Sequence, residues 1–480
     1  MAGDNLLKFV ERDQAYPSKR DAEARAEDFR EIADRYAVQA AEDQSARCSQ
    51  CGVPYCSVHC PLHNHIPDWL RLTAEGRLRE AYELSNSTST MPEICGRICP
   101  QDRLCEGNCV IEFSGHGAVT IGSVEKFITD TAWEEGWVEP LVPGPARGQS
   151  VGVIGAGPAG LAAAEYMRAY GYEVHVYDRY DRAGGLLTYG IPGFKLEKPV
   201  VMRRVDRLKA GGIVFHEGFS VGEDASLDDL RTKHDALLIA TGVYKPRAIR
   251  APGVGAAGVV EALEYLTASN RKGFGDAVPA FDDGSLNAAG KHVVVIGGGD
   301  TAMDCVRTAV RQGATSVKCL YRRDRANMPG SQRETKNAEE EGVEFVWLSA
   351  PEAFEGGDVV TGVKASAMRL GAPDASGRRT PEVDPAGGFS VKADLVIKAL
   401  GFDAEDLPRV FDAPELGVTR WGTLRVDAKS MMTSLDGVFA AGDIVRGASL
   451  VVWAIRDGRD VSERMHGWLK ARAKSVKVAA

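Results

Sequence analysis

Eight of the ten cysteines in this chain lie between positions 48 and 109, and four of them fall within the thirteen residues CSQCGVPYCSVHC (48–60). Thiols packed this closely can bind zinc or iron–sulfur clusters, or can form disulfides. The spacing divides them into two sets of four, which matches two metal sites with four thiolate ligands each. The two sets are Cys48, Cys51, Cys56 and Cys60, and Cys95, Cys99, Cys105 and Cys109.

The spacing within the sets favours iron–sulfur clusters over zinc. Structural zinc sites typically use paired Cys-x2-Cys knuckles, and only Cys48 and Cys51 have that spacing here. The pairs Cys60-Pro61 and Cys99-Pro100 instead resemble the Cys-Pro ending of ferredoxin cluster runs. We therefore expect two [4Fe–4S] clusters.

A glycine-rich turn at Gly155-Ala-Gly157-Pro-Ala-Gly160 follows an apolar strand and opens a helix. In a dinucleotide-binding unit the first glycine allows the tight turn, and the second lets pyrophosphate approach the backbone. The third lets the helix and the strand pack closely. Asp178 ends the next strand, where a carboxylate can accept hydrogen bonds from a ribose diol. These residues predict a dinucleotide site that prefers an unphosphorylated ribose.

A second turn, Gly297-Gly-Gly299-Asp300-Thr301-Ala302, repeats the pattern with a permitted final alanine. The strand that follows it ends in Arg322 and Arg323, where a ribose 2′-hydroxyl would require a carboxylate. Two guanidinium groups match a 2′-phosphate, so this unit is predicted to bind NADPH. The economical assignment then places FAD at the first turn.

Apolar segments that end in glycine mark further strands of the two units. ALLIATG (236–242), LVIKALG (395–401) and GVFAAGD (437–443) read as buried parallel strands that end at a nucleotide cleft. The last can return beside the first unit and bring Gly442 and Asp443 to the ribityl or phosphate region of FAD. NADPH and FAD together require a one-electron outlet, which iron–sulfur clusters provide and zinc does not.

The composition excludes several classes of protein. The chain has 480 residues and a formal charge of −9, without the basic stripe that nucleic-acid binding would usually show. Its N-terminus lacks the apolar region of a secretory signal, and no segment reaches eighteen uninterrupted apolar residues, so no membrane span is expected. We expect a cytoplasmic protein, whose thiols stay reduced.

The order of these features predicts an α/β chain of three parts. A helical module with two clusters should span residues 1–145, with helix-permissive spacing of Phe29, Ile32 and Tyr36 in 19–45 and a helix at 118–136. Residues 138–150 read as a linker. The expected FAD domain comprises residues 146–255 and 403–480, and the NADPH domain, residues 256–402, is inserted in it.

Taken in order, the motifs GAGPAGLAAA, GGLLTYGIPGFKL (184–196), ATG, GGGDTAMDC and AAGD resemble those of the glutamate synthase small (β) subunit family. That family's relatives include the N-terminal half of dihydropyrimidine dehydrogenase. The N-terminal segment LLKFVERDQAYPSKRDAEARAEDFREI is similar too, so the resemblance covers essentially the whole chain. It adds Gly185, Leu186 and Gly242 to the expected FAD-binding residues.

The resemblance implies an electron-input subunit and a hetero-oligomer. NADPH would reduce FAD, and electrons would pass through the clusters to an FMN-containing large (α) subunit that makes L-glutamate from L-glutamine and 2-oxoglutarate. The alternative is an NADPH-dependent ferredoxin-type oxidoreductase with a different partner or none. Hydride transfer between nicotinamide and flavin needs no side-chain acid or base, so we predict no catalytic residue.

The resemblance to dihydropyrimidine dehydrogenase also implies that the cysteine sets exchange a ligand, as ferredoxin-like runs often do. One cluster would then be bound by Cys48, Cys51, Cys56 and Cys109. Cys60, Cys99 and Cys105 would begin the second cluster. In that relative the fourth ligand is a glutamine, and this chain has Glu125 at the corresponding position. Cys95 and Glu125 therefore compete, and the softer thiolate of Cys95 is slightly favoured.

Overall fold

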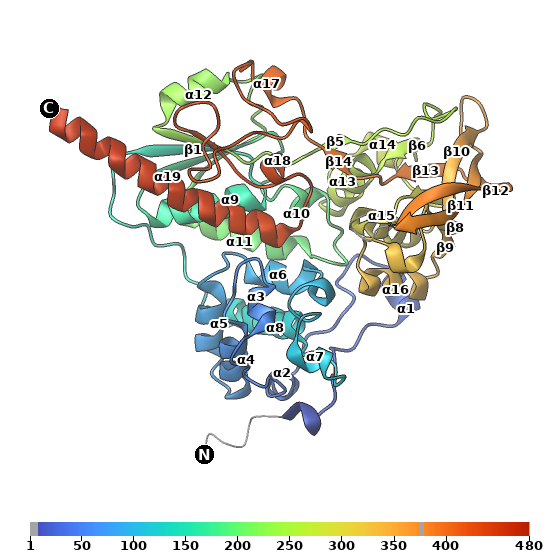
Figure 1. Cartoon of the computed structure of the whole chain (residues 1–480), viewed down its shortest axis with the longest axis horizontal. Coiled ribbons are helices and arrows are strands. Elements are labelled where there is room, and N and C mark those ends of the chain that lie inside the picture. Colours follow the sequence, from blue (N-terminus) through green and yellow to red (C-terminus); the bar gives the residue numbers. More distant parts are fainter. Residues whose placement is uncertain (1–7, 374–378, 480) are drawn as a thin grey trace.

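The computed structural model of the chain describes residues 8–373 and 379–479. It has a helical module and two α/β units, which lie around a common centre (Figure 1). The outermost residues of the predicted domains, 1–7 and 480, lie outside the described residues.

The helical module carries the eight clustered cysteines on short helices and the turns between them. Its helices are α2 (Val38–Ser45), α3 (Tyr55–Val58), α4 (Ile66–Ala74), α5 (Leu78–Asn86), α6 (Pro92–Ile98), α7 (Val110–Phe113) and α8 (Ile121–Glu134). They pack around buried side chains such as Trp69, Phe127 and Ile128. The predicted helix at 118–136 is confirmed as α8.

The predicted helical character of residues 19–45 is wrong for the middle of that segment. Only α1 (Ala22–Ala26) and α2 are helical, and the chain between them is irregular and folds back, since Lys19 and Ala33 form an antiparallel bridge. There the backbone N–H of Arg20 donates to the carbonyl of Ile32, and the Phe29 ring lies 6.2 Å from that of Phe194. Contacts with distant residues override the local helical spacing. Figure 1 shows this stretch leading from the helical module to α1, beside the second α/β unit.

The first α/β unit contains a five-stranded parallel sheet in the order β15-β4-β1-β2-β3. The strands are β1 (Ser150–Ile154), β2 (Glu173–Asp178), β3 (Val214–Glu217), β4 (Ala236–Ile239) and β15 (Val438–Ala440). Its helices are α9 (Pro158–Ala169), α10 (Leu186–Tyr189), α11 (Lys198–Ala210), α12 (Leu227–Lys233), α17 (Leu407–Val410), α18 (Asp443–Arg446) and α19 (Val451–Ala479). Helices α9 and α19 pack closely at Gly458, where a Cβ would lie only 2.3 Å from the carbonyl oxygen of Ala159.

The second α/β unit contains another five-stranded parallel sheet, in the order β6-β13-β7-β8-β9. Its strands are β6 (Val259–Glu261), β7 (His292–Ile296), β8 (Ser316–Tyr321), β9 (Glu344–Trp347) and β13 (Leu395–Lys398). Its helices are α13 (Ala262–Gly273), α14 (Pro279–Asp282), α15 (Asp300–Arg311) and α16 (Gln332–Glu340). An antiparallel sheet of β10 (Ser349–Glu355), β11 (Gly362–Pro373) and β12 (Arg379–Lys392) extends from this unit.

The second unit is inserted in the first, because its whole sheet lies in the sequence between β4 and β15. The chain crosses between the units through β5 (Lys245–Pro246) and β14 (Phe402–Asp403), which pair antiparallel. The predicted fold class is therefore confirmed. No helix in the described part of the chain is both long and apolar enough to cross a membrane.

Candidate functional site

The first glycine-rich turn has the geometry that dinucleotide binding requires. Gly155 has φ +107°, in the region that favours glycine. A Cβ at Gly157 would meet no protein atom within 4 Å, so this side of the turn is open to a ligand. At Gly160 a Cβ would lie 1.9 Å from the carbonyl oxygen of Gly155, so only glycine allows this close packing.

A cavity of about 110 Å³ lies against this turn and is lined by distant segments of the first unit. We call it the FAD-side cavity, because the sequence predicts FAD at this turn. Its lining includes Gly155, Gly157, Asp178, Leu186, Gly242, Asp443 and Ser449–Val451. Two further glycines pack closely beside the cavity. A Cβ at Gly185 would lie 2.9 Å from Gly157 Cα, and a Cβ at Gly442 would lie 2.9 Å from Ala159 Cβ. The sequence therefore identified residues that converge on one cavity, although they span almost 290 positions.

Of the two carboxylates of this cavity, Asp178 is buried and Asp443 is half-buried. Asp178 accepts hydrogen bonds from the backbone N–H groups of Ala156 (2.6 Å) and Tyr180 (2.8 Å), and Asp443 accepts one from the Ser449 hydroxyl (2.7 Å). Burial raises the pKa of Asp178 and of Asp443 above the usual range. These contacts hold the two carboxylates in place as acceptors for ligand hydroxyls.

The second turn borders a larger cavity, with a volume of about 530 Å³, which we call the large cavity. Gly297 has φ +150° and approaches the Ala399 carbonyl, and a Cβ at Gly299 would meet no protein atom within 4 Å. Gly297, Gly299 and Thr301 line one part of the cavity, and Arg322 and Arg323 line another. A glycine turn at the start of α15 and two guanidiniums thus face one space of nucleotide size.

Two other polar residues of this region are directed elsewhere. Asp300, predicted to bind the cofactor, does not line the large cavity; it lines an adjoining cavity of about 170 Å³, and its carboxylate accepts a hydrogen bond from the Ser331 backbone N–H at 3.0 Å. Arg325, which follows the two cavity arginines, forms an ion pair with Glu339 at 2.7 Å. The structure therefore separates Arg325 from its two neighbours.

Four cysteines line a cavity near the surface of the helical module, which we call the outer cysteine cavity. They are Cys48, Cys51, Cys56 and Cys109. Burial raises the pKa of Cys48 and of Cys56 to about 12. Thiols with such values are neutral at pH 7, so binding of a cationic metal centre would release their protons. Four thiols around one apolar cavity fit an iron–sulfur cluster.

The other four cysteines line what we call the inner cysteine cavity, which faces the first α/β unit. They are Cys60, Cys95, Cys99 and Cys105, and Glu125 and Val452 lie in the same lining. Burial raises the pKa of Cys60 to about 11. The first cysteine run thus contributes to both cavities, since Cys56 lines the outer one and Cys60 the inner one.

Neither cavity has the arrangement of a single-ion site. Among the described residues, no three His, Cys, Asp or Glu side chains are placed to hold one metal ion. The thiols of a [4Fe–4S] site surround a cluster of four irons instead of converging on one ion. All ten cysteines are free of disulfides.

Glu125 lies beside the inner cysteines with its carboxyl group already bound to protein groups. Its Oε1 accepts hydrogen bonds from Ser85 Oγ at 3.2 Å and Asn64 Nδ2 at 3.4 Å. Burial raises the pKa of Glu125 to about 8, so the carboxyl group is mostly protonated at pH 7. Cys95 lines the same cavity; its Sγ lies 3.9 Å from Ser89 Oγ and it also contacts the thiol of Cys99, another residue of the lining.

A further cavity of about 170 Å³, which we call the central cavity, lies where the three parts of the chain meet. The helical module contributes Cys99, the second unit contributes Thr301 and Asp304, and the first unit contributes Lys195 and Ser449–Val451. Ser449–Val451 also line the FAD-side cavity, Thr301 lines the large cavity, and Cys99 lines the inner cysteine cavity. One space therefore connects the three predicted cofactor sites.

Some cavity residues were not predicted from the sequence. Arg247 lines the large cavity and Tyr244 lines the FAD-side cavity, and both lie in the crossover that follows ATG (240–242). No local pattern marks them, because the crossover is positioned by its pairing with Phe402–Asp403. Lys195, in contrast, belongs to the motif GIPGFKL that carried the family resemblance.

Two family models match the chain. The model of dihydropyrimidine dehydrogenase domain II, 4Fe-4S cluster, covers residues 25–137. The model of pyridine nucleotide-disulphide oxidoreductases covers residues 149–458. Among solved structures, Mycobacterium tuberculosis FprA in complex with NADPH aligns with a TM-score of 0.57 and 18% identity, over 68% of this chain and 86% of that chain. This last likeness shows a shared fold.

Sequence relatives extend over the whole chain. The glutamate synthase (NADPH) small chain of Azospirillum brasilense is 68% identical over the full length of both chains. That of Escherichia coli K12 is 44% identical over 97% of this chain and 99% of its own. The putative oxidoreductase AegA of Escherichia coli K12 is also 44% identical, over 98% of this chain and 72% of its own. The chain belongs to the family of the glutamate synthase (NADPH) small chain and is an NADPH-dependent flavin and iron–sulfur oxidoreductase.

Proposed function

We propose that the chain is the cytoplasmic electron-input subunit of glutamate synthase, with NADPH as donor and the FMN-containing large subunit as acceptor. The observation that carries this proposal is the central cavity, where Thr301, Ser449–Val451 and Cys99 bring the three cofactor sites together. In this assignment FAD occupies the first glycine turn and NADPH the second. Two [4Fe–4S] clusters occupy the inner and outer cysteine cavities.

The cofactors would be held by the predicted residues. Asp178 and Asp443 would accept hydrogen bonds from FAD, with Gly155, Gly157 and Gly160 at its pyrophosphate. Arg322 and Arg323 would bind the 2′-phosphate of NADPH. When bound, FAD accepts a hydride from NADPH and releases its electrons singly, which cluster chemistry requires. The protein's contribution is to bring the two sites together at the central cavity and to limit the access of water.

We propose that electrons leave through the inner cavity first and the outer cavity second. Val451 lines the FAD-side cavity and the next residue, Val452, lines the inner cysteine cavity, so the two cavities meet adjacent residues at the start of α19. Ile121 lines both cysteine cavities. No residue that lines the outer cavity adjoins one that lines the FAD-side cavity in the sequence, so the inner cavity is the first station in this order.

For the second cluster we propose Cys60, Cys95, Cys99 and Cys105 as ligands. Glu125 would stay a neighbour of the cluster, because Ser85 and Asn64 already bind its carboxyl group. Thiolate is also the softer ligand for iron in such clusters. For the first cluster we propose Cys48, Cys51, Cys56 and Cys109.

The large subunit would dock where the outer cavity reaches the surface. Five exposed apolar side chains, Val53, Tyr55, Val58, Val110 and Phe113, lie within four positions of the outer-cavity cysteines. Residues 48–67 contain no Asp, Glu, Lys or Arg, although 26% of the chain is charged. Exposed apolar groups without charge are typical of the centre of a protein interface. We call these five residues the docking patch.

Isolation of the chain from its native cells tests the proposal. We expect it to come down with an FMN-containing large subunit, and we expect the complex to make glutamate from glutamine and 2-oxoglutarate with NADPH. The putative oxidoreductase among the relatives favours a second candidate, a reductase with another partner. If the purified chain reduces ferredoxin rapidly and binds no such subunit, that second candidate replaces the first.

The NADPH assignment has its own test. The double variant Arg322→Ala/Arg323→Ala should raise KM for NADPH by about 10-fold or more and leave KM for NADH nearly unchanged, since a 2′-phosphate would lose both of its charged partners. Arg325→Ala is the matched control, because Arg325 pairs with Glu339 and lies outside the cavity lining. Equal effects on the two coenzymes would contradict the 2′-phosphate site.

A further inference from the structure

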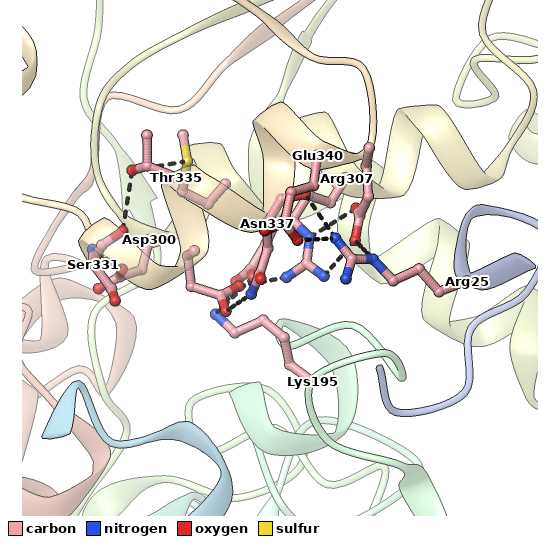
Figure 2. A network of polar contacts seen from close by, with 12 residues as sticks. Arg25, Lys195, Asp300, Arg307, Ser331, Thr335, Asn337 and Glu340 are labelled. Carbon is pink, nitrogen blue, oxygen red and sulfur yellow. Dashed lines mark hydrogen bonds and ion pairs between the residues drawn. The ribbon is translucent and has the colours of Figure 1, made fainter. Parts of the chain in front are cut away.

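A network of buried charges joins the second α/β unit to the rest of the chain (Figure 2). Four cations, Arg25, Lys195, Arg307 and Arg311, meet four carboxylates, Asp304, Glu334, Glu340 and Glu341. The side chains of Arg307, Arg311 and Glu341 are 0% exposed. Two of the cations come from outside the second unit, so the network spans more than one part of the fold.

The first α/β unit contributes two adjacent residues of the GIPGFKL motif. Lys195 Nζ lies 2.9 Å from Asp304 Oδ1 and 3.8 Å from Glu334 Oε2. The ring of Phe194 lies under the guanidiniums of Arg307 and Arg311, at 4.4 and 4.0 Å from the ring centroid. Such cation–π contacts are strongest when they are removed from water, as they are here. This loop therefore anchors the first unit to helix α15 of the second.

The N-terminal segment that contains α1 contributes the third part of the charge network. Arg25 on α1 lies 2.7 Å from Glu340 and 3.0 Å from Glu341, with a side chain that is 2% exposed. At the other end of the segment, Glu31 pairs with Arg97 and with Lys126 of the helical module, each at 2.6 Å. The segment therefore ties the second unit to the helical module, and these contacts account for the non-helical course of the chain between α1 and α2.

The network adjoins the site where hydride transfer must occur. Lys195 and Asp304 line the central cavity together with Thr301 and Ser449–Val451. Removal of one partner from a buried ion pair costs about 3–5 kcal/mol, because it leaves the other charge buried without its partner. Any rotation that separates the two units would break the Lys195–Asp304 pair.

We propose that Lys195 and Arg25 are positioning residues that clasp the NADPH-binding unit in the one orientation that places nicotinamide against the flavin. This inference rests on the proposed transfer from NADPH to FAD. In consequence, hydride transfer in this chain takes place without a prior rotation of the NADPH-binding unit. The clasp consists of Arg25, Phe194, Lys195 and their partners on α15 and α16.

The first test compares Lys195→Met with Lys195→Arg in the full chain. For Lys195→Met we expect unchanged FAD content and a Kd for NADP⁺ within about twofold, while flavin reduction at saturating NADPH slows by about 10-fold or more. The long-wavelength charge-transfer absorbance of the nicotinamide–flavin pair should disappear. Lys195→Arg should restore both, because it keeps the charge. Flavin reduction as fast in Lys195→Met as in the unaltered chain would overturn the proposal.

Asp304→Asn combined with Lys195→Met sharpens the result. If the two residues act as a pair, the double variant should reduce its flavin no more slowly than Lys195→Met alone. Fully additive slowing would overturn the pairing. If NADPH does not reduce the flavin of the unaltered chain, the proposed function itself fails, whereas a loss confined to the variants concerns the clasp.

Hydrogen exchange gives a readout that does not depend on added NADPH or on activity. In Arg25→Met and in Lys195→Met, amide exchange in residues 332–341 should rise as the second unit loosens. Lys364→Met is the matched control, because it removes an exposed ion pair of the same unit, with Glu352. Exchange in 332–341 that is the same in Arg25→Met as in the control would overturn the role of the N-terminal segment.

Discussion

The two cysteine cavities are built from the same kind of ligand but have opposite surroundings. The inner cavity is bordered by Glu125, by Val452 of the first α/β unit, and by the central cavity through Cys99. The outer cavity is lined by short loops and by two exposed residues of the docking patch, Val110 and Tyr55, the latter 47% exposed. One cavity therefore faces the nucleotide sites and the other faces the solvent.

This difference indicates how two similar cysteine sites can have different functions because they lie in different places in the fold. A site at the junction of three units can receive electrons from a flavin but cannot be reached by another protein. A site under an uncharged apolar surface can be approached by a partner but lies far from the nucleotides. In our proposal the inner site therefore accepts electrons from the flavin, and the outer site passes them to the large subunit.

The largest expected effect comes from removing either cluster. Cys99→Ser and Cys56→Ser should each lose about four irons per chain and lower NADPH-driven glutamate formation by about 1000-fold, because the two sites act in series. Iron analysis and turnover with the large subunit measure this. Only Cys99→Ser should also alter the flavin spectrum, since Cys99 borders the central cavity. Substantial turnover in Cys56→Ser would show that the outer site is not on the route.

The inner cavity should depend on the domain interface more than the outer one does. Glu93 on α6 forms a bidentate ion pair with Arg204 on α11 (2.8 and 2.9 Å), and both side chains are almost fully buried. Glu93→Gln should therefore destabilise the fold by about 3 kcal/mol, because it leaves Arg204 buried without a counter-charge. Chemical denaturation checks this value. The exposed pair of Arg77 and Glu80 supplies the control, Glu80→Gln, with little change expected.

The outer cavity should be the one that responds to changes at the surface. Phe113→Asp should weaken binding of the large subunit by about 30-fold, or about 2 kcal/mol, because it places a charge in an apolar contact. Reduction of the flavin by NADPH should be unaffected. Trp421→Asp is the matched control, since Trp421 is similarly exposed at 67% but lies in another part of the chain. Equal weakening by both variants would argue against the docking patch.

The smallest effect is expected at Glu125. Glu125→Gln keeps the size of the side chain and can keep the contacts with Ser85 and Asn64, so iron content should stay within about 20% of the unaltered value if Cys95 is the ligand. Cys95→Ser should instead lose about four irons. The reverse result, with iron lost only in Glu125→Gln, would make Glu125 the fourth ligand of the inner cluster.

Sequence reasoning succeeded where function depends on a local pattern. The roles of Gly155, Gly157 and Gly160 follow from their spacing, because each is set by the same turn. The resemblance to a known family supplied the exchange of Cys109 for Cys60, which spacing alone leaves open. The structure then places those cysteines around the cavities that the resemblance implied.

Reasoning from the sequence failed where distant segments decide the outcome. The residues between α1 and α2 have helical spacing, but their contacts with Phe194, Arg97 and Lys126 hold them in an irregular, non-helical conformation. Arg323 and Arg325 both follow the end of β8, two and four residues beyond Tyr321, and only the position of Glu339 on α16 shows that Arg325 points elsewhere. Lys195 could be quoted in a motif, but its role required the position of Asp304.

In the proposed ligand assignment, the exchange of Cys60 and Cys109 between the cysteine runs has a consequence for biosynthesis. The ribosome releases Cys48, Cys51 and Cys56 early, yet Cys109 completes their cavity only after the three later inner ligands, Cys95, Cys99 and Cys105, have emerged. A nascent chain interrupted before Cys109 would present seven thiols and could finish only one cavity. Cluster delivery is therefore expected to await release of the whole helical module, and failed delivery at one site would leave the other exposed to loss.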